Sequence, residues 1–303
     1  MIYDFLVTTN RYDVWYYKDN GSLYPYNKSG GNKPQINGDN MDLKLVDKIV
    51  LITGSTAGIG FAIAKAFSSE GARTIINGRS ENSVTRAIND LKSSTDGEVL
   101  GFTGDLSLES VAADLIEAHP RVDILVNNLG IYEPVPFEEI PDEDWRRFFE
   151  VNVLSGVRLS RIYLPSMKER NWGRIIFISS ESGIQIPAEM IHYGMTKAAQ
   201  IAIARGLAEH VTGADITVNS VLPGPTKSRG VGDFVNELAA KAGKTFEEFE
   251  REFFEKVRPT SLIKRFASPD EVASLVCYLG SPLASATTGA ALRVDGGVVK
   301  SAY

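Results

Sequence analysis

Short apolar runs alternate with segments of helical periodicity over most of the chain, and this alternation constrains the fold most strongly. Residues 59–69, for example, place Ile59, Ile63 and Phe67 on one helical face. Strands that alternate with helices predict right-handed β-α-β units. We therefore expect an α/β fold with one domain over residues 41–303, a doubly wound parallel sheet with helices on both faces. The strand-like runs are 48–53, 74–77, 99–103, 124–127, 174–179, 216–222 and 290–294.

Residues 1–40 form an N-terminal extension with a different composition, rich in Tyr, Gly and Asn. Two aromatic runs flank Asn20-Gly21, a dipeptide typical of tight hairpin turns. One interpretation is a small aromatic hairpin followed by a flexible linker. The other is a disordered extension or a remnant of an expression vector. The tyrosines of this segment are Tyr3, Tyr12, Tyr16, Tyr17, Tyr24 and Tyr26.

Charge and cysteine content narrow the range of functions. The formal net charge is −6 and the pI about 5.3, so we do not expect nucleic-acid binding. Cys277 is the single cysteine and the histidines have no metal-ligand spacing, so we expect neither an internal disulfide nor a metal site. No apolar run approaches the roughly 18 residues of a membrane-spanning helix, and the N-terminus does not resemble a secretory signal. These features favour a cytoplasmic protein without a membrane partner.

The first strand runs into a glycine-rich turn, T-G-S-T-A-G-I-G at residues 53–60, and a helix follows. Glycines allow a tight turn and let backbone N–H groups approach a pyrophosphate at the positive N-terminus of the helix. The spacing G-x-x-x-G-x-G differs from the common G-x-G-x-x-G, but its place between strand and helix favours dinucleotide binding. The candidate cofactor-binding residues here are Gly54, Ser55, Thr56, Gly58, Ile59 and Gly60.

The end of the second strand, Asn77-Gly78-Arg79-Ser80, bears on the choice of cofactor. An NAD site usually places an acidic residue there to hold the ribose 2′-hydroxyl, whereas an Arg accommodates the 2′-phosphate of NADP. Gly78 stands where the acid is expected, and Arg79 and Ser80 follow. The sequence therefore favours NADP as the cofactor, with NAD possible.

A tyrosine and a lysine one helical turn apart, Tyr193 and Lys197, begin a long helical segment. At this spacing the phenol and the ammonium share one helix face, and the cation should lower the pKa of the tyrosine toward neutrality. Ser180 follows the strand-like run 174–179, at the edge of the sheet where ligands bind. We expect Ser180 to hold a substrate oxygen while Tyr193 exchanges its proton, and we expect Ser179 and Ser182 to be structural.

In this combination and order, the motifs make residues 41–303 resemble the short-chain dehydrogenase/reductase family, including its 3-oxoacyl reductase-like oxidoreductases, over the whole family domain. The motifs are 53–60, Gly104-Asp105-Leu106, Asn127-Asn128-Leu129-Gly130, Asn152, Ser180, Tyr193, Lys197, Pro223-Gly224-Pro225-Thr226 and Val294-Asp295-Gly296-Gly297. The resemblance implies a single-domain Rossmann fold and nicotinamide chemistry.

The resemblance also implies roles for individual residues. Ser180, Tyr193 and Lys197 become the catalytic core, and Asn152 holds a water that links Lys197 to solvent. Lys197 and Tyr193 also meet the cofactor. The remaining implied cofactor contacts are Asp105 at the adenine, Asn128 at the adenosine, Leu106, Leu129 and Gly130 nearby, and Pro223, Gly224 and Thr226 at the carboxamide.

The sequence departs from the family pattern at three places. Leu129 replaces a small residue, usually Ala, so contacts beside the cofactor could differ. The turn at 223–228 reads P-G-P-T-K-S, so either Thr226 or Ser228 could supply the usual hydroxyl. The extension at 1–40 has no counterpart in the family pattern.

Residues 227–260 occupy the place where family members carry a substrate lid. We expect helices at 234–242 and 246–257, with Gly230 and Gly232 as hinges. An aromatic stripe on the second helix is typical of core packing, but as a wall of the lid it favours a medium-sized apolar substrate. Its rings are Phe246, Phe249, Phe253 and Phe254.

The leading hypothesis is an NADP(H)-dependent oxidoreductase that interconverts a carbonyl and a secondary alcohol. The alternative is a non-catalytic dinucleotide-binding sensor or scaffold of the same fold. By resemblance, an amphipathic helix at 144–150 indicates a homodimer or homotetramer. His192 could line the pocket or be structural, and Cys277 should lie in or near the core.

Overall fold

The computed structural model describes residues 7–10, 13–17, 23–25, 41–227 and 244–302. The chain divides into two compact units, Met1–Asp42 and Leu43–Tyr303. Expectations for Ser228, the Gly230 and Gly232 hinges and a helix at 234–242 lie outside the described residues.

The first unit contains a three-stranded antiparallel sheet in the order β1-β2-β3. Its strands are β1 (Val7–Asn10), β2 (Asp13–Tyr17) and β3 (Leu23–Pro25). Tyr16 of β2 pairs with Tyr24 of β3. The Asn20-Gly21 turn expected between these strands lies outside the described residues.

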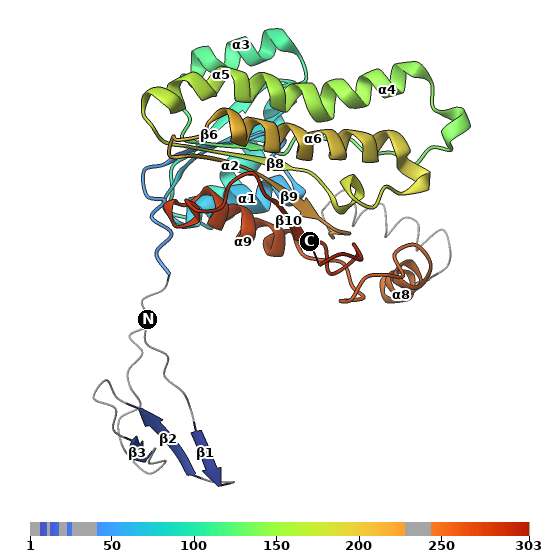
Figure 1. Ribbon diagram of the computed structural model, residues 1–303. Coiled ribbons are helices and arrows are strands. Elements are labelled where there is room, and N and C mark those ends of the chain that lie inside the picture. The colour runs from blue at the N-terminus through green and yellow to red at the C-terminus, as the bar shows by residue number, and fades with distance from the viewer. Residues whose placement is uncertain (1–6, 11–12, 18–22, 26–40, 228–243, 303) are drawn as a thin grey trace. The chain divides into compact units, whose positions relative to one another are not determined.

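The described part of the second unit forms a seven-stranded sheet in the order β10-β9-β8-β7-β4-β5-β6 (Figure 1). All of its pairings are parallel. The chain builds outward from β4 through β5 to β6 and then crosses back to place β7 on the other side of β4. This reversal creates a switch point between β4 and β7, where open α/β sheets bind ligands. The strands are β4 (Ile49–Ile52), β5 (Arg73–Gly78), β6 (Val99–Thr103), β7 (Ile124–Asn127), β8 (Gly173–Ile178), β9 (Ile216–Pro223) and β10 (Ala291–Val294).

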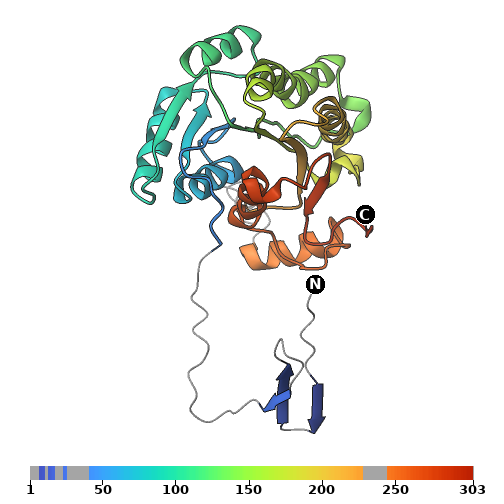
Figure 2. The same ribbon diagram turned by 60° about the vertical axis from the view of Figure 1, so that its left-hand side comes forward.

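Helices cover both faces of this sheet (Figure 2). Neighbouring residues of β4 point to opposite faces, so Val50 belongs to one core cluster and Leu51 to the other. Helices α1, α2 and α9 contribute to the first cluster, and α3, α5 and α6 to the second. The helices are α1 (Gly58–Ser69), α2 (Glu81–Lys92), α3 (Glu109–Ala118), α4 (Asp142–Phe149), α5 (Ser155–Glu169), α6 (Ile191–His210), α8 (Phe246–Lys256) and α9 (Pro269–Gly280).

Short helical segments connect the longer elements, and three of them approach the site described below. A π-helical turn, η2 (Glu150–Leu154), joins α4 to α5. The 3-10 turns η3 (Glu181–Gly183) and η4 (Ala188–Met190) lie between β8 and α6. The others are η1 (Phe137–Glu139) and η5 (Pro282–Ala284).

The expected alternation of strands and helices, and the parallel sheet that it predicts, are confirmed. Each strand of the large sheet lies within about a residue of its predicted position. Helix α6 begins at Ile191, two residues before the expected Tyr193. Cys277 is buried in α9, as expected, and burial raises the pKa of its thiol to about 12. Within the described residues, no helix is both long and apolar enough to span a membrane, and the cytoplasmic location stays a prediction.

The aromatic stripe of α8 packs into a small cluster of its own. Phe254 is 2% exposed and, with Phe266, forms the centre against which Phe246, Phe249 and Phe253 pack. The ring centroids of Phe253 and Phe266 are 5.0 Å apart. Ring contacts at this distance are typical of aromatic side chains packed in a core. Core packing therefore explains the aromatic stripe of α8, the feature from which the sequence predicted an apolar substrate.

Candidate active site

The turn between β4 and α1 has the conformation that its glycines allow. Gly54 and Gly58 have φ values of +58° and +59°, which lie in the left-handed region. A Cβ atom on Gly60 would lie 2.6 Å from both the Gly54 carbonyl oxygen and Asn128 Nδ2. A side chain at position 60 would therefore force the turn away from the end of β7.

Polar side chains join this turn to the neighbouring strand ends across the switch point. Asn128 Nδ2 donates to the carbonyl oxygens of Thr53 and Gly54 at 2.9 and 3.0 Å. Thr53 Oγ1 in turn accepts the backbone N–H groups of Asn128 and Leu129, both at 2.9 Å. Asn77 Oδ1 accepts the N–H of Gly54 at 3.1 Å. Sequence reasoning missed Asn77, although a polar residue that ends an apolar strand is a usable signal.

Ser55 differs from the other candidate residues of the turn because its side chain faces inward. It is fully buried, and its Oγ donates to the Ile52 carbonyl oxygen at 2.7 Å. The same Oγ accepts the backbone N–H of Asn77 at 2.9 Å. The backbone N–H of Ser55 donates to the Asn77 carbonyl oxygen at 2.9 Å, so neither its hydroxyl nor its N–H is free to meet a ligand. Thr56, Gly58 and Ile59 are partly exposed around it.

The end of β5 carries Gly78, which packs against the side chain of Thr56. A Cβ atom on Gly78 would lie 2.4 Å from Thr56 Cγ2. Arg79 and Ser80 are exposed, and Ser80 caps α2 by accepting the N–H of Ser83. In the described part of the chain Arg79 forms no ion pair with a carboxylate. An exposed guanidinium here suits a 2′-phosphate.

The candidate adenine contacts follow β6. Asp105 Oδ1 accepts the N–H and the hydroxyl of Ser107 at 3.0 and 2.7 Å, which fixes the carboxylate. Leu106 is 1% exposed and belongs to the core cluster with Leu115. The Leu106 side chain is therefore part of the core, and only its backbone can contact a ligand.

The structure brings Ser180 and Tyr193 together at the carboxyl end of β8. Ser180 caps η3, and its hydroxyl is close enough to the Tyr193 phenol to lower the pKa of that phenol, against the larger effect of burial. Ser182 donates its backbone N–H to Ser180 Oγ at 3.1 Å, and Ser179 Oγ donates to the Lys197 carbonyl oxygen at 2.8 Å. The neighbouring serines thus hold the loop and the helix, as expected of structural residues.

Lys197 does not act on Tyr193 as expected from the sequence alone. Its Nζ lies 5.6 Å from the centroid of the Tyr193 ring and donates to the Ile178 carbonyl oxygen and to Gln200 Oε1, at 2.9 and 3.1 Å. Burial lowers the pKa of Lys197 to about 7, so near neutral pH a sizeable fraction of the amine is uncharged.

Burial, followed by the nearby Glu181 charge, raises the pKa of Tyr193 above its usual value. The expectation that the lysine lowers this pKa is therefore wrong for the protein without cofactor. The physical reason is that the shared helix face is buried, and loss of hydration outweighs the influence of the cation.

Asn152 lies in the π-helical turn η2 and is 1% exposed. Its Oδ1 accepts the N–H of Ile131 at 2.7 Å, and its Nδ2 donates to the Ile131 carbonyl oxygen at 2.9 Å and to Thr196 Oγ1 at 3.0 Å. A Cβ atom on Gly130 would lie 3.5 Å from Lys197 Nζ and 3.6 Å from Asn152 Oδ1. The amide and the lysine thus flank the same glycine.

The turn after β9 packs closely on the end of β10. A Cβ atom on Gly224 would lie 2.7 Å from the Cα atom and the carbonyl oxygen of Asp295. Pro223 ends β9, and Thr226 Oγ1 donates to the Gly224 carbonyl oxygen at 2.9 Å. This geometry holds the Pro223–Thr226 backbone in place at the ligand-binding edge of the sheet.

Two charged residues beside Ser180, Glu181 and Arg258, were not predicted. Ser180 Oγ donates to Glu181 Oε2 at 2.5 Å, and Arg258 Nε lies 3.5 Å from Glu181 Oε1. Glu181 could have been noticed as an acid directly after the candidate serine. No local sequence pattern marks Arg258 as a site residue, because only the packing of α8 brings it to the site.

His192 packs against aromatic rings of α4, and both of its ring nitrogens are buried without a hydrogen-bond partner among the described residues. It is fully buried, and its ring centroid lies 4.0 Å from that of Phe148 and 6.0 Å from that of Trp145. Burial lowers the pKa of its imidazole. The neutral ring therefore helps to pack α6 against α4.

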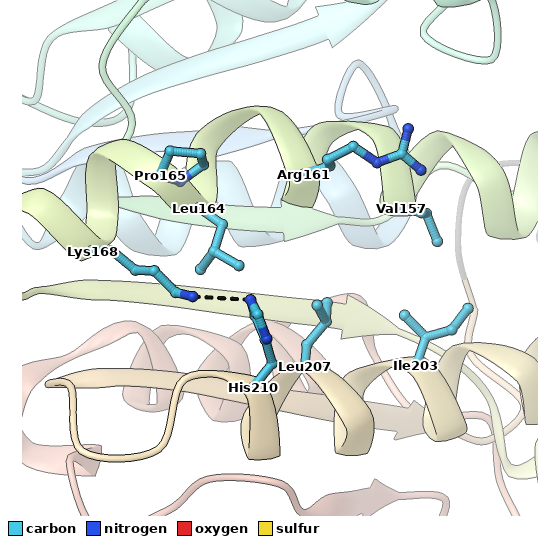
Figure 3. Close-up of a pocket in the computed structure, with 8 residues that line it drawn as sticks. All are labelled: Val157, Arg161, Leu164, Pro165, Lys168, Ile203, Leu207 and His210. Carbon is cyan, nitrogen blue, oxygen red and sulfur yellow. Dashed lines mark hydrogen bonds between the residues drawn. The ribbon is translucent and has the colours of Figure 1, made fainter.

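A pocket of about 430 Å³ lies apart from these residues, between α5 and α6 (Figure 3). One end of it is crossed by a 2.9 Å hydrogen bond between Lys168 Nζ and His210 Nε2. None of the candidate catalytic or cofactor-binding residues lines it. The lining residues are Val157, Arg161, Leu164, Pro165, Lys168, Ile203, Leu207 and His210.

Comparison with known proteins agrees with this fold. A family model described as short chain dehydrogenase matches residues 48–238. The oxidoreductase YvaG of Bacillus subtilis is 50% identical over 264 residues, covering 87% of this chain and 100% of the relative. D-beta-hydroxybutyrate dehydrogenase of Cupriavidus necator is 32% identical and covers 83% of this chain and 98% of its own.

Among solved structures, L-sorbose reductase from Gluconobacter frateurii, complexed with NADPH and L-sorbose, is similar with a TM-score of 0.81. It is 32% identical, and the match covers 86% of this chain and 100% of that chain. The family match spans more than half of the chain, and the relatives are matched over nearly their whole length. The chain therefore belongs to the short-chain dehydrogenase/reductase family of NAD(P)-dependent oxidoreductases.

Proposed function

We propose that the protein interconverts a carbonyl compound and a secondary alcohol, with Tyr193 as the general acid and base. The observation that carries this proposal is that Ser180 and Tyr193 lie close together at the ligand-binding edge of the sheet, with Lys197 one helical turn after Tyr193. Homologues named as dehydrogenases and reductases support catalysis over a non-catalytic sensor or scaffold.

In the reductive direction the Ser180 hydroxyl turns from Glu181 to the carbonyl oxygen and orients it, and Tyr193 donates its proton to that oxygen. The raised pKa of Tyr193 keeps the phenol protonated at neutral pH, as a proton donor requires. We propose, as the family resemblance implies, that Asn152 holds a water linking Lys197 to solvent and that Lys197 passes a replacement proton toward Tyr193. The nicotinamide cofactor, when bound, supplies or accepts the hydride.

We propose NADP(H) as the preferred cofactor, held by the turn at 53–60. The turn leads directly into the N-terminus of α1, which suits a pyrophosphate, and the exposed Arg79 follows Gly78, which offers no carboxylate to repel a 2′-phosphate. The NADPH complex of the similar L-sorbose reductase supports this assignment. The remaining proposed contacts are Asp105, the Leu106 backbone, Asn128, Leu129, Gly130, Tyr193, Lys197, Pro223, Gly224 and Thr226.

For the substrate we propose a carbonyl compound that bears hydroxyl or other polar groups. The α8 rings pack on one another, whereas Glu181 and Arg258 lie next to Ser180. Buried charged groups disfavour an apolar substrate, because contact with it leaves them without polar partners. The polar substrates in the names of the two relatives described above agree with this proposal.

A panel of matched ketones tests the proposal. NADPH oxidation is followed at 340 nm with hydroxylated ketones and with their deoxygenated counterparts of the same carbon skeleton. We expect turnover, with kcat/KM higher for the hydroxylated member of each pair. Faster turnover of the apolar members would favour the apolar substrate predicted from the sequence. Absence of turnover with every carbonyl class would contradict the proposed activity.

We also propose a homodimer or homotetramer, as the family resemblance implies. Light scattering coupled to size-exclusion chromatography measures the mass in solution. A monomer at micromolar concentration would contradict this proposal.

A further inference from the structure

Glu181 is a buried carboxylate in direct contact with the proposed catalytic serine. It is 5% exposed, and its Oε2 accepts the Ser180 hydroxyl at 2.5 Å. A buried charge costs free energy unless it has hydrogen bonds and a counter-charge. The Ser180 hydroxyl is one such partner, so the orientation of that hydroxyl depends on Glu181.

The counter-charge is Arg258, which follows α8. Its Nε lies 3.5 Å from Glu181 Oε1, and its guanidinium also donates to Glu189 Oε1 at 3.2 Å. The Arg258 side chain is 12% exposed, and its backbone N–H donates to the Phe253 carbonyl oxygen at 2.9 Å. The end of α8 is therefore tied electrostatically to the loop that carries Ser180.

Charged and titratable groups from several elements act on the Tyr193 phenol. Glu181 comes from η3, Arg258 follows α8, Tyr132 lies after β7, and Lys197 is one turn further along α6. The Tyr132 and Tyr193 ring centroids are 6.4 Å apart. The negative charge of Glu181 opposes formation of the phenolate, and the positive charge of Arg258 favours it. The two charges therefore act with opposite sign.

We propose that Glu181 and Arg258 are positioning residues: Glu181 orients the Ser180 hydroxyl and holds Tyr193 as a proton donor, while Arg258 moderates that charge from the end of α8. The Glu181–Arg258 pair thus sets the pH range of the reaction, although it lies outside the catalytic candidates Ser180, Tyr193 and Lys197. The inference rests on the proposed function, since it assigns the proton transfer to Tyr193.

The experiment measures the pH dependence of kcat/KM for alcohol oxidation, which requires the deprotonated tyrosine. Glu181→Gln keeps the shape and the hydrogen-bond acceptor but removes the charge, so the rising limb should move to lower pH by about one unit. Arg258→Gln should move it to higher pH. Combining the two substitutions should bring the profile back toward that of the wild type.

Two further variants separate charge from structure. Arg258→Lys keeps the positive charge and should leave the limb near its wild-type position. Glu255→Gln removes one exposed charge from α8 itself and should shift nothing. Thermal unfolding and NADPH fluorescence titration establish that each variant is folded and binds cofactor. If Arg258→Gln fails to fold, the Glu181→Gln profile decides alone.

A loss of kcat without movement of the limb, or a shift of the same sign in both charge variants, would overturn the inference. Failure of the proposed function looks different. In that case Tyr193→Phe would retain activity, whatever the profiles of the Glu181 and Arg258 variants.

Discussion

The cofactor end and the catalytic end of the site are built in different ways. At the cofactor end, backbone geometry dominates, because Gly54 and Gly60 have no side chain and neighbouring groups of the protein pack closely on them. At the catalytic end, side chains from distant segments converge, and burial and charge set their protonation. Ser180 donates to the Glu181 carboxylate and lies close to the Tyr193 phenol. Substitutions at the two ends should therefore separate binding from catalysis.

The largest effect is expected at the catalytic end, from Tyr193→Phe. It removes the proposed proton donor and leaves the backbone of α6 unchanged, so kcat should fall by roughly 10²–10⁴-fold. The Kd of NADPH, measured by fluorescence titration, should stay near the wild-type value. A variant that kept more than about a tenth of kcat would assign the proton transfer to another group.

At the cofactor end, Arg79→Ala should weaken NADPH binding and leave NADH binding unchanged. Hydrogen bonds to a charged group contribute about 1.5–3 kcal/mol, so the Kd of NADPH should rise roughly 10- to 100-fold. Calorimetric titration with both cofactors measures the difference. Equal weakening for NADH and NADPH would show that Arg79 does not read the 2′-phosphate. kcat at saturating NADPH should change little.

The smallest effect is expected from removal of residues 1–40, which lie in a separate compact unit. The truncated chain should keep its melting temperature and its kcat/KM, because the β-α-β series begins after it. Deletion through residue 47 is the matched control. It removes Leu45, which is fully buried in the core, and should cost about 2–5 kcal/mol of stability. Loss of activity on the shorter deletion would give the extension a structural role.

Much of the large domain was predictable because its signals are local. Each buried strand is a short apolar run, and a parallel sheet buried on both faces needs such runs at regular intervals. The turn at Gly54 and Gly60 was predictable for the same reason, since glycine is needed wherever backbones come close. The positions of Tyr193 and Lys197 on one helix also follow from helical spacing.

The protonation of the catalytic residues was not predictable from that spacing. A nearby lysine favours the phenolate and burial disfavours it, and the spacing in the sequence does not say which effect is larger. In the folded chain Lys197 is 4% exposed, and its amine donates to the Ile178 carbonyl oxygen and to Gln200. Burial therefore reverses the sign expected for Tyr193.

The aromatic stripe of α8 shows the same division between local pattern and tertiary packing. The sequence predicts which face of that helix is apolar, but the partner of that face, Phe266, lies beyond the end of α8. Folding places Phe254 against Phe266 and places Arg258 against Glu181. What faces the substrate is thus decided by the packing of the whole segment.

By itself the sequence determined the strand and helix segments, the glycine turn and the shared helix face of Tyr193 and Lys197, because these depend on neighbours one to four positions away. Tertiary structure alone decided that Glu181 and Arg258 meet beside Ser180. It also decided that His192 packs against Phe148. Such contacts join residues far apart in the chain, and their energies depend on burial, a property that no local pattern contains.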